Sequence, residues 1–299
     1  MKCKRCGDTA VVSLPSHTTG FCAPCFLEFF RRQVDRGIEG QKLLEPGERI
    51  LVALSGGKDS LSLMLALSEL GHDVTALHID LGIPGSSDAA RAAVERFCAR
   101  HGFALIVRNM TEEGLPLPKV KERLHRPICS ACGSIKRHYF NRVALEQGFA
   151  VLATGHNLDD ETARLFSNTL RWDAAYLSVQ GPRLESETGF ARKIKPFWRL
   201  TEFEIANYAL LRGIENHYAP CPYSAGASFT MYKRVWLDIE AAMPGRKLHF
   251  YQSFLERGKK AFAAAEAGRG ETLRACAECG SPSSHEVCGV CRIRRALSG

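Results

Sequence analysis

The chain has 299 residues, of which 45% are hydrophobic and 24% charged, which suits one large globular domain or two smaller ones. Its formal net charge of +8 falls to about +4 if eight cysteines bind two zinc ions as thiolates, so total charge is weak support for a nucleic-acid partner. It contains no run of eighteen apolar residues and begins MKCKRCGDTA without an apolar leader, which predicts a cytoplasmic protein that neither crosses a membrane nor carries a secretory signal.

Residues 1–25 form a predicted cap that carries four cysteines. Two C-x-x-C pairs separated by 15 residues provide four thiolates for one tetrahedral zinc ion. Without a metal, the cap would be a short polar segment with no core to fold it. The pattern therefore predicts a structural zinc site. Its ligands would be Cys3, Cys6, Cys22 and Cys25.

The next segments alternate between helical and extended patterns. A helix is predicted over 26–45, ending at Pro46-Gly47, followed by strands at 49–54, 73–80, 103–110 and 150–155. Between them, helices are predicted after SGGKDS, over 88–101, over about 133–148, and again from about 158. This alternation predicts an α/β fold with a doubly wound parallel sheet, in which ligands bind beyond the carboxyl ends of the strands. Residues 200–265 are predicted to be mostly helical.

The string SGGKDS, residues 55–60, lies between a predicted strand and a predicted helix. Glycines let backbone amides approach an anion, and the start of the helix adds partial positive charge. Ser55 and Ser60 can also donate hydroxyl groups to phosphate oxygens. The Walker A pattern is absent. A tight structural turn is the alternative, but the strand context favours a phosphate-binding loop.

Two more polar strings follow predicted strands. HID ends the strand at 73–80, and TGHNLDD follows the strand at 150–155. In the second string, Asp159 and Asp160 can hold Mg²⁺ or position a reacting group. One of the two could instead only cap the helix that begins there. Asp160 is the predicted member of the active site.

A central C-x-x-C pair, Cys129 and Cys132, has no second pair nearby. Spacing alone leaves three interpretations: half of a zinc site, a redox dithiol, or two ligands that need a distant third. Cys98 stands alone in a helical pattern and is predicted to be a small core residue.

The last cap repeats the arrangement of the first. Two C-x-x-C pairs are separated by eight residues, and the first pair is followed by a glycine as a tight turn allows. A second structural zinc site is predicted here. Its ligands would be Cys276, Cys279, Cys288 and Cys291. The predicted organisation is an N-terminal zinc finger over 1–25, a catalytic domain with a helical C-terminal part over 26–265, and a C-terminal zinc finger over 266–299.

The string S-G-G-K-D-S in its strand context resembles the pyrophosphatase loop (PP-loop) of the N-type ATP pyrophosphatases, which have the adenine nucleotide alpha hydrolase-like fold. The whole chain resembles the TtcA/TtuA family of tRNA 2-thiolation enzymes, in particular its zinc-capped branch that makes 2-thiouridine. Besides the loop, the likeness rests on CSACGSIKR, ATGHNLDDE, KPFWR, LLRGI and CPYSAGAS, which occur in the family's order.

The resemblance implies a role for each motif. Cys129, Cys132 and Cys221 would hold a [4Fe-4S] cluster with one iron open to sulfur; a dithiol that forms a persulfide is the alternative. Lys136 would be catalytic or position the substrate, although a solvated surface lysine is the alternative. Asp59 and Asp160 would complete the catalytic set. The implied contacts of ATP with Mg²⁺ are Ala53, Ser55, Gly56, Gly57, Lys58, Asp59, Ser60, His78, Ile79 and Gly155.

The implied activity is ATP-dependent tRNA sulfur transfer. The enzyme would adenylate O2 of a uridine, most readily 5-methyluridine 54 of the T-loop, and replace it with sulfur delivered through the cluster. Wobble uridine 34 and cytidine 32 are alternative targets, and an inactive zinc-ribbon tRNA-binding protein is an alternative of a different class. The implied partners are tRNA, a ubiquitin-like sulfur carrier with a C-terminal thiocarboxylate (or free sulfide), and a second copy of the chain in a homodimer.

Overall fold

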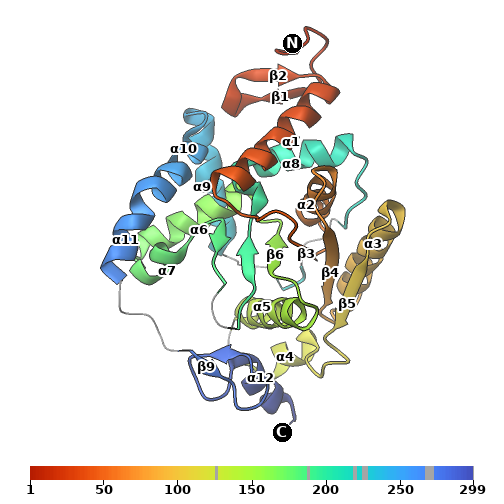
Figure 1. Cartoon of the computed structure of the whole chain (residues 1–299), viewed down its shortest axis with the longest axis vertical. Coiled ribbons are helices and arrows are strands. Elements are labelled where there is room, and N and C mark those ends of the chain that lie inside the picture. The colour runs from red at the N-terminus through yellow and green to blue at the C-terminus, as the bar shows by residue number, and fades with distance from the viewer. Residues whose placement is uncertain (125–126, 187–188, 218–220, 224–227, 267–272, 299) are drawn as a thin grey trace.

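The computed structural model describes residues 1–299 except 125–126, 187–188, 218–220, 224–227, 267–272 and 299. A six-stranded sheet lies at its centre (Figure 1), with strand order β5-β4-β3-β6-β8-β7. All neighbouring strands are parallel except β7 and β8, which confirms the predicted doubly wound α/β fold. The strands are β3 (Ile50–Leu54), β4 (Val74–Asp80), β5 (Leu105–Asn109), β6 (Val151–Thr154), β7 (Arg183–Leu184) and β8 (Arg192–Ile194).

Helices cover both faces of this sheet, as a parallel sheet requires. Side chains of β3 alternate between two cores: Ile50, Val52 and Leu54 pack in the larger cluster, and Leu51 and Ala53 in the smaller one. The helices are α1 (Ala23–Gly40), α2 (Lys58–Glu69), α3 (Ser86–His101), α4 (Leu117–Arg123), α5 (Ile128–Glu146), α6 (Leu158–Leu170), α7 (Ala174–Val179), α8 (Glu202–Leu211), α9 (Ser228–Ala242), α10 (Arg246–Ser253), α11 (Lys259–Glu266) and α12 (Gly289–Ser298).

Two predicted helix boundaries are wrong. The helix predicted over 26–45 spans Ala23–Gly40, and the helix predicted over 133–148 spans Ile128–Glu146. The second helix begins directly after Pro127, whose missing N–H removes no hydrogen bond at a helix start. The central C-x-x-C therefore lies in the first turns of α5, and Lys136 lies more than two turns into the helix, not near its start.

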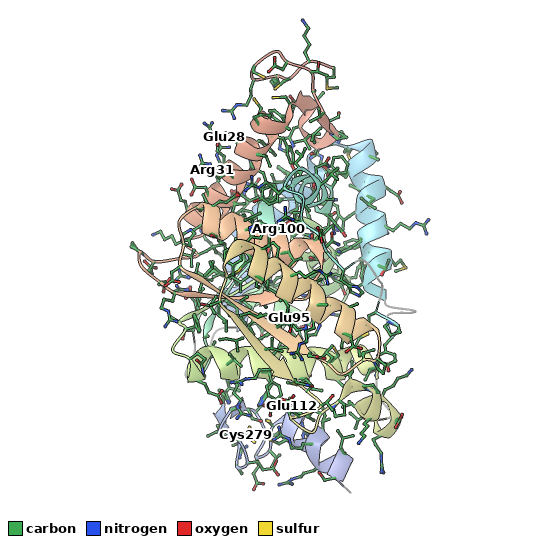
Figure 2. The ribbon with its side chains drawn as sticks, turned by 90° about the vertical axis from the view of Figure 1, so that its right-hand side faces the viewer. Glu28, Arg31, Glu95, Arg100, Glu112 and Cys279 are labelled. Atoms are coloured by element: carbon green, nitrogen blue, oxygen red, sulfur yellow. The ribbon has the colours of Figure 1, made fainter. Side chains whose placement is uncertain are left out.

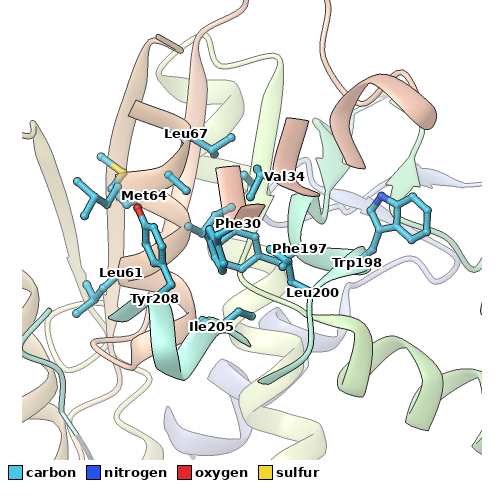
Figure 3. Packing of buried hydrophobic residues seen from close by; sticks show 14 of the residues in the cluster. Phe30, Val34, Leu61, Met64, Leu67, Phe197, Trp198, Leu200, Ile205 and Tyr208 are labelled. Carbon is cyan, nitrogen blue, oxygen red and sulfur yellow. The ribbon is translucent and has the colours of Figure 1, made fainter. Parts of the chain in front are cut away.

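An aromatic cluster joins the N-terminal segment to the sheet domain. Phe30 of α1 stacks on Tyr208 of α8 with ring centroids 4.0 Å apart, and it packs against Phe197 in a T-shaped arrangement with centroids 5.4 Å apart. Figure 3 shows these rings against Leu61 and Met64 of α2. Burying one such side chain stabilises a fold by about 1.5–3 kcal/mol, so α1 is held firmly. Cys98 is buried in the same core, as predicted.

The two cysteine caps lie at opposite ends of the molecule (Figure 1). The first contains the hairpin of β1 (Val12–Leu14) and β2 (Thr19–Phe21), and the second contains β9 (Arg274–Ala275) paired with β10 (Pro282–Ser283). In the side view of Figure 2, Glu28 and Arg31 mark α1 near one end and Cys279 marks the other end. Within the part of the chain that the structure describes, no helix is both long and apolar enough to cross a membrane.

Candidate functional site

Each cap brings its four cysteine sulfurs together. Within each set the Sγ atoms all lie within 4.8 Å of one another; Cys6 and Cys22 are 3.5 Å apart, and Cys279 and Cys288 are 3.7 Å apart. Tetrahedral zinc with Zn–S bonds of about 2.3 Å places its sulfurs about 3.8 Å apart. The thiols therefore fit two structural zinc ions, as predicted.

Backbone amides prepare one thiol in each cap for metal binding. Desolvation opposes ionisation of Cys3, but N–H groups of Cys22, Cys6 and Arg5 lower the pKa of its thiol to about 6. Desolvation likewise opposes ionisation of Cys276, yet N–H groups that include that of Cys288 lower the pKa of Cys276 to about 6. Since zinc binds the thiolate, these amides favour the metal-bound state.

A cavity of about 650 Å³ opens where β3, β4 and β6 end. This is the carboxyl edge of the parallel strands, where α/β sheets bind ligands. The cavity brings together twelve of the predicted site residues, which come from five separate segments of the chain. They are Ala53, Ser55, Asp59, Ser60, His78, Ile79, Cys129, Cys132, Lys136, Gly155, Asp160 and Cys221.

The loop from Ser55 to Ser60 has the shape of an anion cradle. Ser60 Oγ donates to Gly57 O over 3.0 Å and accepts from Ser55 N over 3.1 Å. The Ser60 hydroxyl therefore stabilises the loop in the absence of nucleotide, and its donation to a bound phosphate stays a prediction. Gly56 has φ of +81°, and an added Cβ would lie 2.8 Å from Ala90 O. At Gly155 an added Cβ would lie 3.0 Å from Ser60 N, so both positions need glycine.

The two adjacent aspartates have different environments. Asp159 is 4% exposed and its side chain accepts from Glu202 N and from the ammonium of Lys247. Asp160 lines the cavity and also accepts from Asn157 N at the start of α6. The predicted choice of Asp160 thus matches its position, although Asp160 also completes the helix cap. The carboxylate of Asp159 instead makes its hydrogen bonds within the protein interior.

Two lysines face one carboxylate beside the loop. Lys58 Nζ lies 2.9 Å from one oxygen of Glu202, and Lys233 Nζ lies 3.3 Å from the other. Lys58 also pairs with Asp59 at 3.1 Å and Lys233 with Asp160 at 2.7 Å. Desolvation opposes the charge of Lys233, but Asp160 and Glu202 raise its pKa to about 12. The resulting cluster links the loop to α8 and α9.

These ion pairs hold the side chain of Lys58 outside the lining of the cavity, although the sequence predicts Lys58 as an ATP contact. It is not among the described residues that line the cavity, and neither are Gly56 and Gly57. Burial raises the pKa of Asp59, and the positive charge of Lys58 partly opposes that shift. Asp59 also accepts from the amide of Asn157 over 3.3 Å. The carboxylate is therefore held between the loop and the start of α6.

The three central cysteines share the cavity with the loop. Cys129 Sγ contacts Tyr223 O at 3.8 Å, and Cys132 is half-buried on the same helix. Burial raises the pKa of Cys132, Lys136 opposes this, and negative charge on Cys221 and Cys129 adds to it. Cys129, Cys132 and Cys221 all line the cavity. Among the described residues, no fourth cysteine lines the cavity, so the donor set fits a cluster with three thiolate ligands.

Several residues of the site had no signal in the sequence. Glu202 and Lys233 were not predicted, because each contacts partners far away along the chain and belongs to no local motif. His217 was also missed; its side chain lines the cavity and its N–H donates to Gly56 O over 2.8 Å. Thr201-x-x-Glu204 could have located the start of α8 as a capping box, but not the role of its neighbour Glu202.

Comparison with known proteins gives consistent matches. Residues 27–218 match the family described as PP-loop domain, and residues 2–27 match 2-thiouridine synthetase TtuA, N-terminal LIM domain. The chain is 42% identical to tRNA-5-methyluridine(54) 2-sulfurtransferase of Thermus thermophilus, covering 99% of this chain and 92% of that protein. Identity to the protein of the same name from Thermotoga maritima is 38%, covering 99% and 97%.

A solved structure agrees over nearly the whole chain. U34-tRNA thiolase NcsA from Methanococcus maripaludis, determined with its [4Fe-4S] cluster, has a TM-score of 0.81 and 28% sequence identity. The match covers 99% of this chain and 96% of that one. The fold therefore extends through both cysteine caps.

Proposed function

Since the chain belongs to the PP-loop family that includes the tRNA-5-methyluridine(54) 2-sulfurtransferases, we propose that it is an ATP-dependent tRNA sulfurtransferase that converts 5-methyluridine 54 to its 2-thio form. One observation carries the proposal: the phosphate loop and the three central cysteines line the same cavity. Activation by ATP and delivery of sulfur can therefore happen at one base without moving it between sites.

The reaction has two displacement steps. The uridine O2 oxygen first attacks the α-phosphorus of ATP, and the bond to the pyrophosphate oxygen breaks. A sulfur nucleophile then attacks C2, and the C2–O2 bond breaks with AMP as the leaving group. Adenylation is needed because a carbonyl oxygen is otherwise a poor leaving group.

The loop and its neighbours supply the groups for the first step. Backbone amides of the loop and the start of α2 bind the phosphates. Asp59 and Asp160 are the carboxylates that would hold Mg²⁺, which would offset the negative charge of the phosphates. Lys58 and Lys233 stand beside them on Glu202 and add positive charge.

The second step uses the other wall of the cavity. Cys129, Cys132 and Cys221 would hold the [4Fe-4S] cluster, which supplies an iron without a protein ligand as a binding site for sulfur. Lys136 lies on the same helix as two of these cysteines and lines the cavity. We propose that its ammonium orients the base or the departing phosphate. Its half-buried position is unlike that of a freely solvated lysine.

We also propose how the enzyme is organised and supplied. The two zinc fingers, 1–25 and 266–299, flank a catalytic domain over 26–265. Sulfur comes from a ubiquitin-like carrier protein with a C-terminal thiocarboxylate, or from free sulfide, and the enzyme acts as a homodimer in the cytoplasm. Light scattering tests the dimer, and thiolation supported by sulfide alone, without the carrier, would show that the carrier is dispensable.

The decisive test is anaerobic thiolation of tRNA that contains 5-methyluridine 54. We expect ATP-dependent 2-thiolation at that position, detected by mass spectrometry of nucleosides, with release of AMP and pyrophosphate. Cys221→Ala and Asp59→Ala should abolish thiolation and keep the wild-type zinc content. Thiolation at uridine 34 or cytidine 32, and not at position 54, would show that our proposal names the wrong target base. Tight tRNA binding without any pyrophosphate release would mean an inactive tRNA-binding protein.

A further inference from the structure

His156 belongs to the string TGHNLDD and comes soon after the end of β6. Its side chain is exposed and lines the cavity, so the imidazole is open to a molecule bound there. Nδ1 lies 2.8 Å from the hydroxyl oxygen of Thr154, and Nε2 makes no hydrogen bond among the contacts of the described residues. A hydroxyl oxygen accepts as well as donates. When Nδ1 donates to Thr154, Nε2 carries a lone pair that is available to the ligand.

The other carboxylates and imidazoles of the cavity are paired or buried. Asp59 and Asp160 each form an ion pair with a lysine, at 3.1 Å and 2.7 Å. His78 and His217 also line the cavity, but Nε2 of each is fully buried and out of reach of a bound base. Among the described residues that line the cavity, His156 therefore provides the accessible imidazole.

The surroundings of His156 favour the neutral ring. The cavity is concave, so the ring loses much of its hydration although a ligand can reach it. This desolvation lowers the pKa of His156, Lys195 and Arg164 lower it further, and Glu161 and Asp160 oppose the shift. A neutral imidazole can accept a proton from a substrate, and the two carboxylates then stabilise the imidazolium.

We propose that His156 is a catalytic base whose Nε2 removes the N3 proton of the target uridine while O2 attacks ATP. The inference rests on the proposed function, because it takes adenylation of O2 as the first step. As O2 bonds to the α-phosphorus and the bond to pyrophosphate breaks, the electron pair of the N3–H bond becomes the second bond between N3 and C2. The adenylated base is then neutral. If N3 kept its proton, the adenylated base would be a cation.

The second step regenerates the neutral histidine. When the sulfur nucleophile attacks C2 and the C2–O2 bond breaks, the imidazolium returns its proton to N3. AMP leaves, and the product is the neutral 2-thio base. His156 thus ends the turnover in the form in which it began, and the proton transfers need no oxidant or reductant.

The test follows pyrophosphate release in a single turnover of the anaerobic holoenzyme with ATP and tRNA that contains 5-methyluridine 54. His156→Gln retains a polar group near the place of Nε2 but cannot accept a proton. We expect this variant to release pyrophosphate about 10²–10⁴-fold more slowly than the wild type, with unchanged affinities for ATP and tRNA. His249→Gln, at an exposed histidine on α10, should keep the wild-type rate.

Two readouts distinguish a base from a residue that only positions the substrate. The wild-type rate should rise with pH and level off once His156 is neutral, and His156→Gln should lack this transition. With 5-fluorouridine at position 54, whose N3 proton is more acidic, the loss of rate in His156→Gln should be smaller than with 5-methyluridine. Equal losses with both bases, an unchanged transition, or a wild-type rate in His156→Gln would overturn the inference.

Failure of the inference can be told from failure of the proposed function. If the wild type releases no pyrophosphate with tRNA, the proposed function is wrong and the inference with it, whereas release by the wild type with any of the three results above overturns the inference alone. If His156→Gln does not fold, nitrogen-15 NMR of the wild type decides. The pKa of the His156 ring should agree with the pKa of the transition in the rate profile, and a different value contradicts the inference.

Discussion

Asp159 and Asp160 are neighbours in sequence, yet substitutions at the two positions should have opposite consequences. Asp159 and Lys247 form an ion pair whose side chains are 6% and 3% exposed. Removing one partner of a buried pair leaves an uncompensated charge and costs about 3–5 kcal/mol. We therefore expect Asp159→Asn and Lys247→Met each to lower the free energy of unfolding by about that amount.

Asp160 pairs with Lys233 in a more exposed place, with side chains 20% and 26% exposed. Solvent screens such a pair, which contributes about 0–1 kcal/mol. Asp160→Asn should therefore keep nearly wild-type stability and lose thiolation. It is the matched control for Asp159→Asn, because the chemical change is the same one residue away.

Urea unfolding followed by the fluorescence of the buried Trp198 and Trp236 measures the effect. Zinc content should stay at the wild-type value in all variants. The double variant Asp159→Asn with Lys247→Met should lose clearly less than the sum of the single losses, since neither charge is then left alone. Equal stability of the Asp159 and Asp160 variants, or strict additivity in the double variant, would refute this reasoning.

Three further outcomes follow from the structure. Burial raises the pKa of Glu204 from 4.5 to about 7, so the folded state binds this proton more tightly than the unfolded state. The free energy of unfolding should therefore fall by up to about 3 kcal/mol as pH rises from 4.5 to 7. Denaturation measured at several pH values should show this dependence in the wild type and not in Glu204→Gln. Gly56→Ala should weaken ATP binding strongly, because the new Cβ would clash with Ala90 O. Gly47 has a similar φ of +77° but nothing within 4 Å of an added Cβ, so Gly47→Ala should bind ATP normally. Equal ATP affinities of the two variants would contradict the proposed loop geometry. Cys3→Ser and Cys276→Ser should each lower the zinc content by one of the two ions expected per chain. Elemental analysis that finds no loss would show that the substituted cysteine is not a zinc ligand.

Local patterns account for what could be predicted from the sequence. Both zinc sites are recognisable because all four ligands of each lie within a few tens of residues at fixed spacing. The strands β3 to β6 and the loop after β3 are recognisable because buried parallel strands are continuous apolar runs. The position after a strand pointed to Asp159 and Asp160 together, and the structure puts Asp160 at the cavity.

Contacts over long sequence distances account for what could not be predicted. Glu202 forms ion pairs with Lys58, 144 residues earlier, and with Lys233, 31 residues later. No local sequence pattern predicts contacts over such distances. Strands β7 and β8 have two and three residues, too few for a periodic signal. The helix predicted from about residue 133 begins at Ile128, directly after Pro127, and includes Cys129 and Cys132 in its first turns.

The course of α1 has a consequence for how the molecule opens. This one helix begins between Cys22 and Cys25 of the first metal site and continues to Gly40, with Phe26, Phe30 and Val34 fully buried in the large core. Its backbone hydrogen bonds cannot break at the cap without disturbing the core. The amide protons of α1 should therefore exchange with solvent together with those of the central strands, as one cooperative unit, and should not fray separately with the end of the chain.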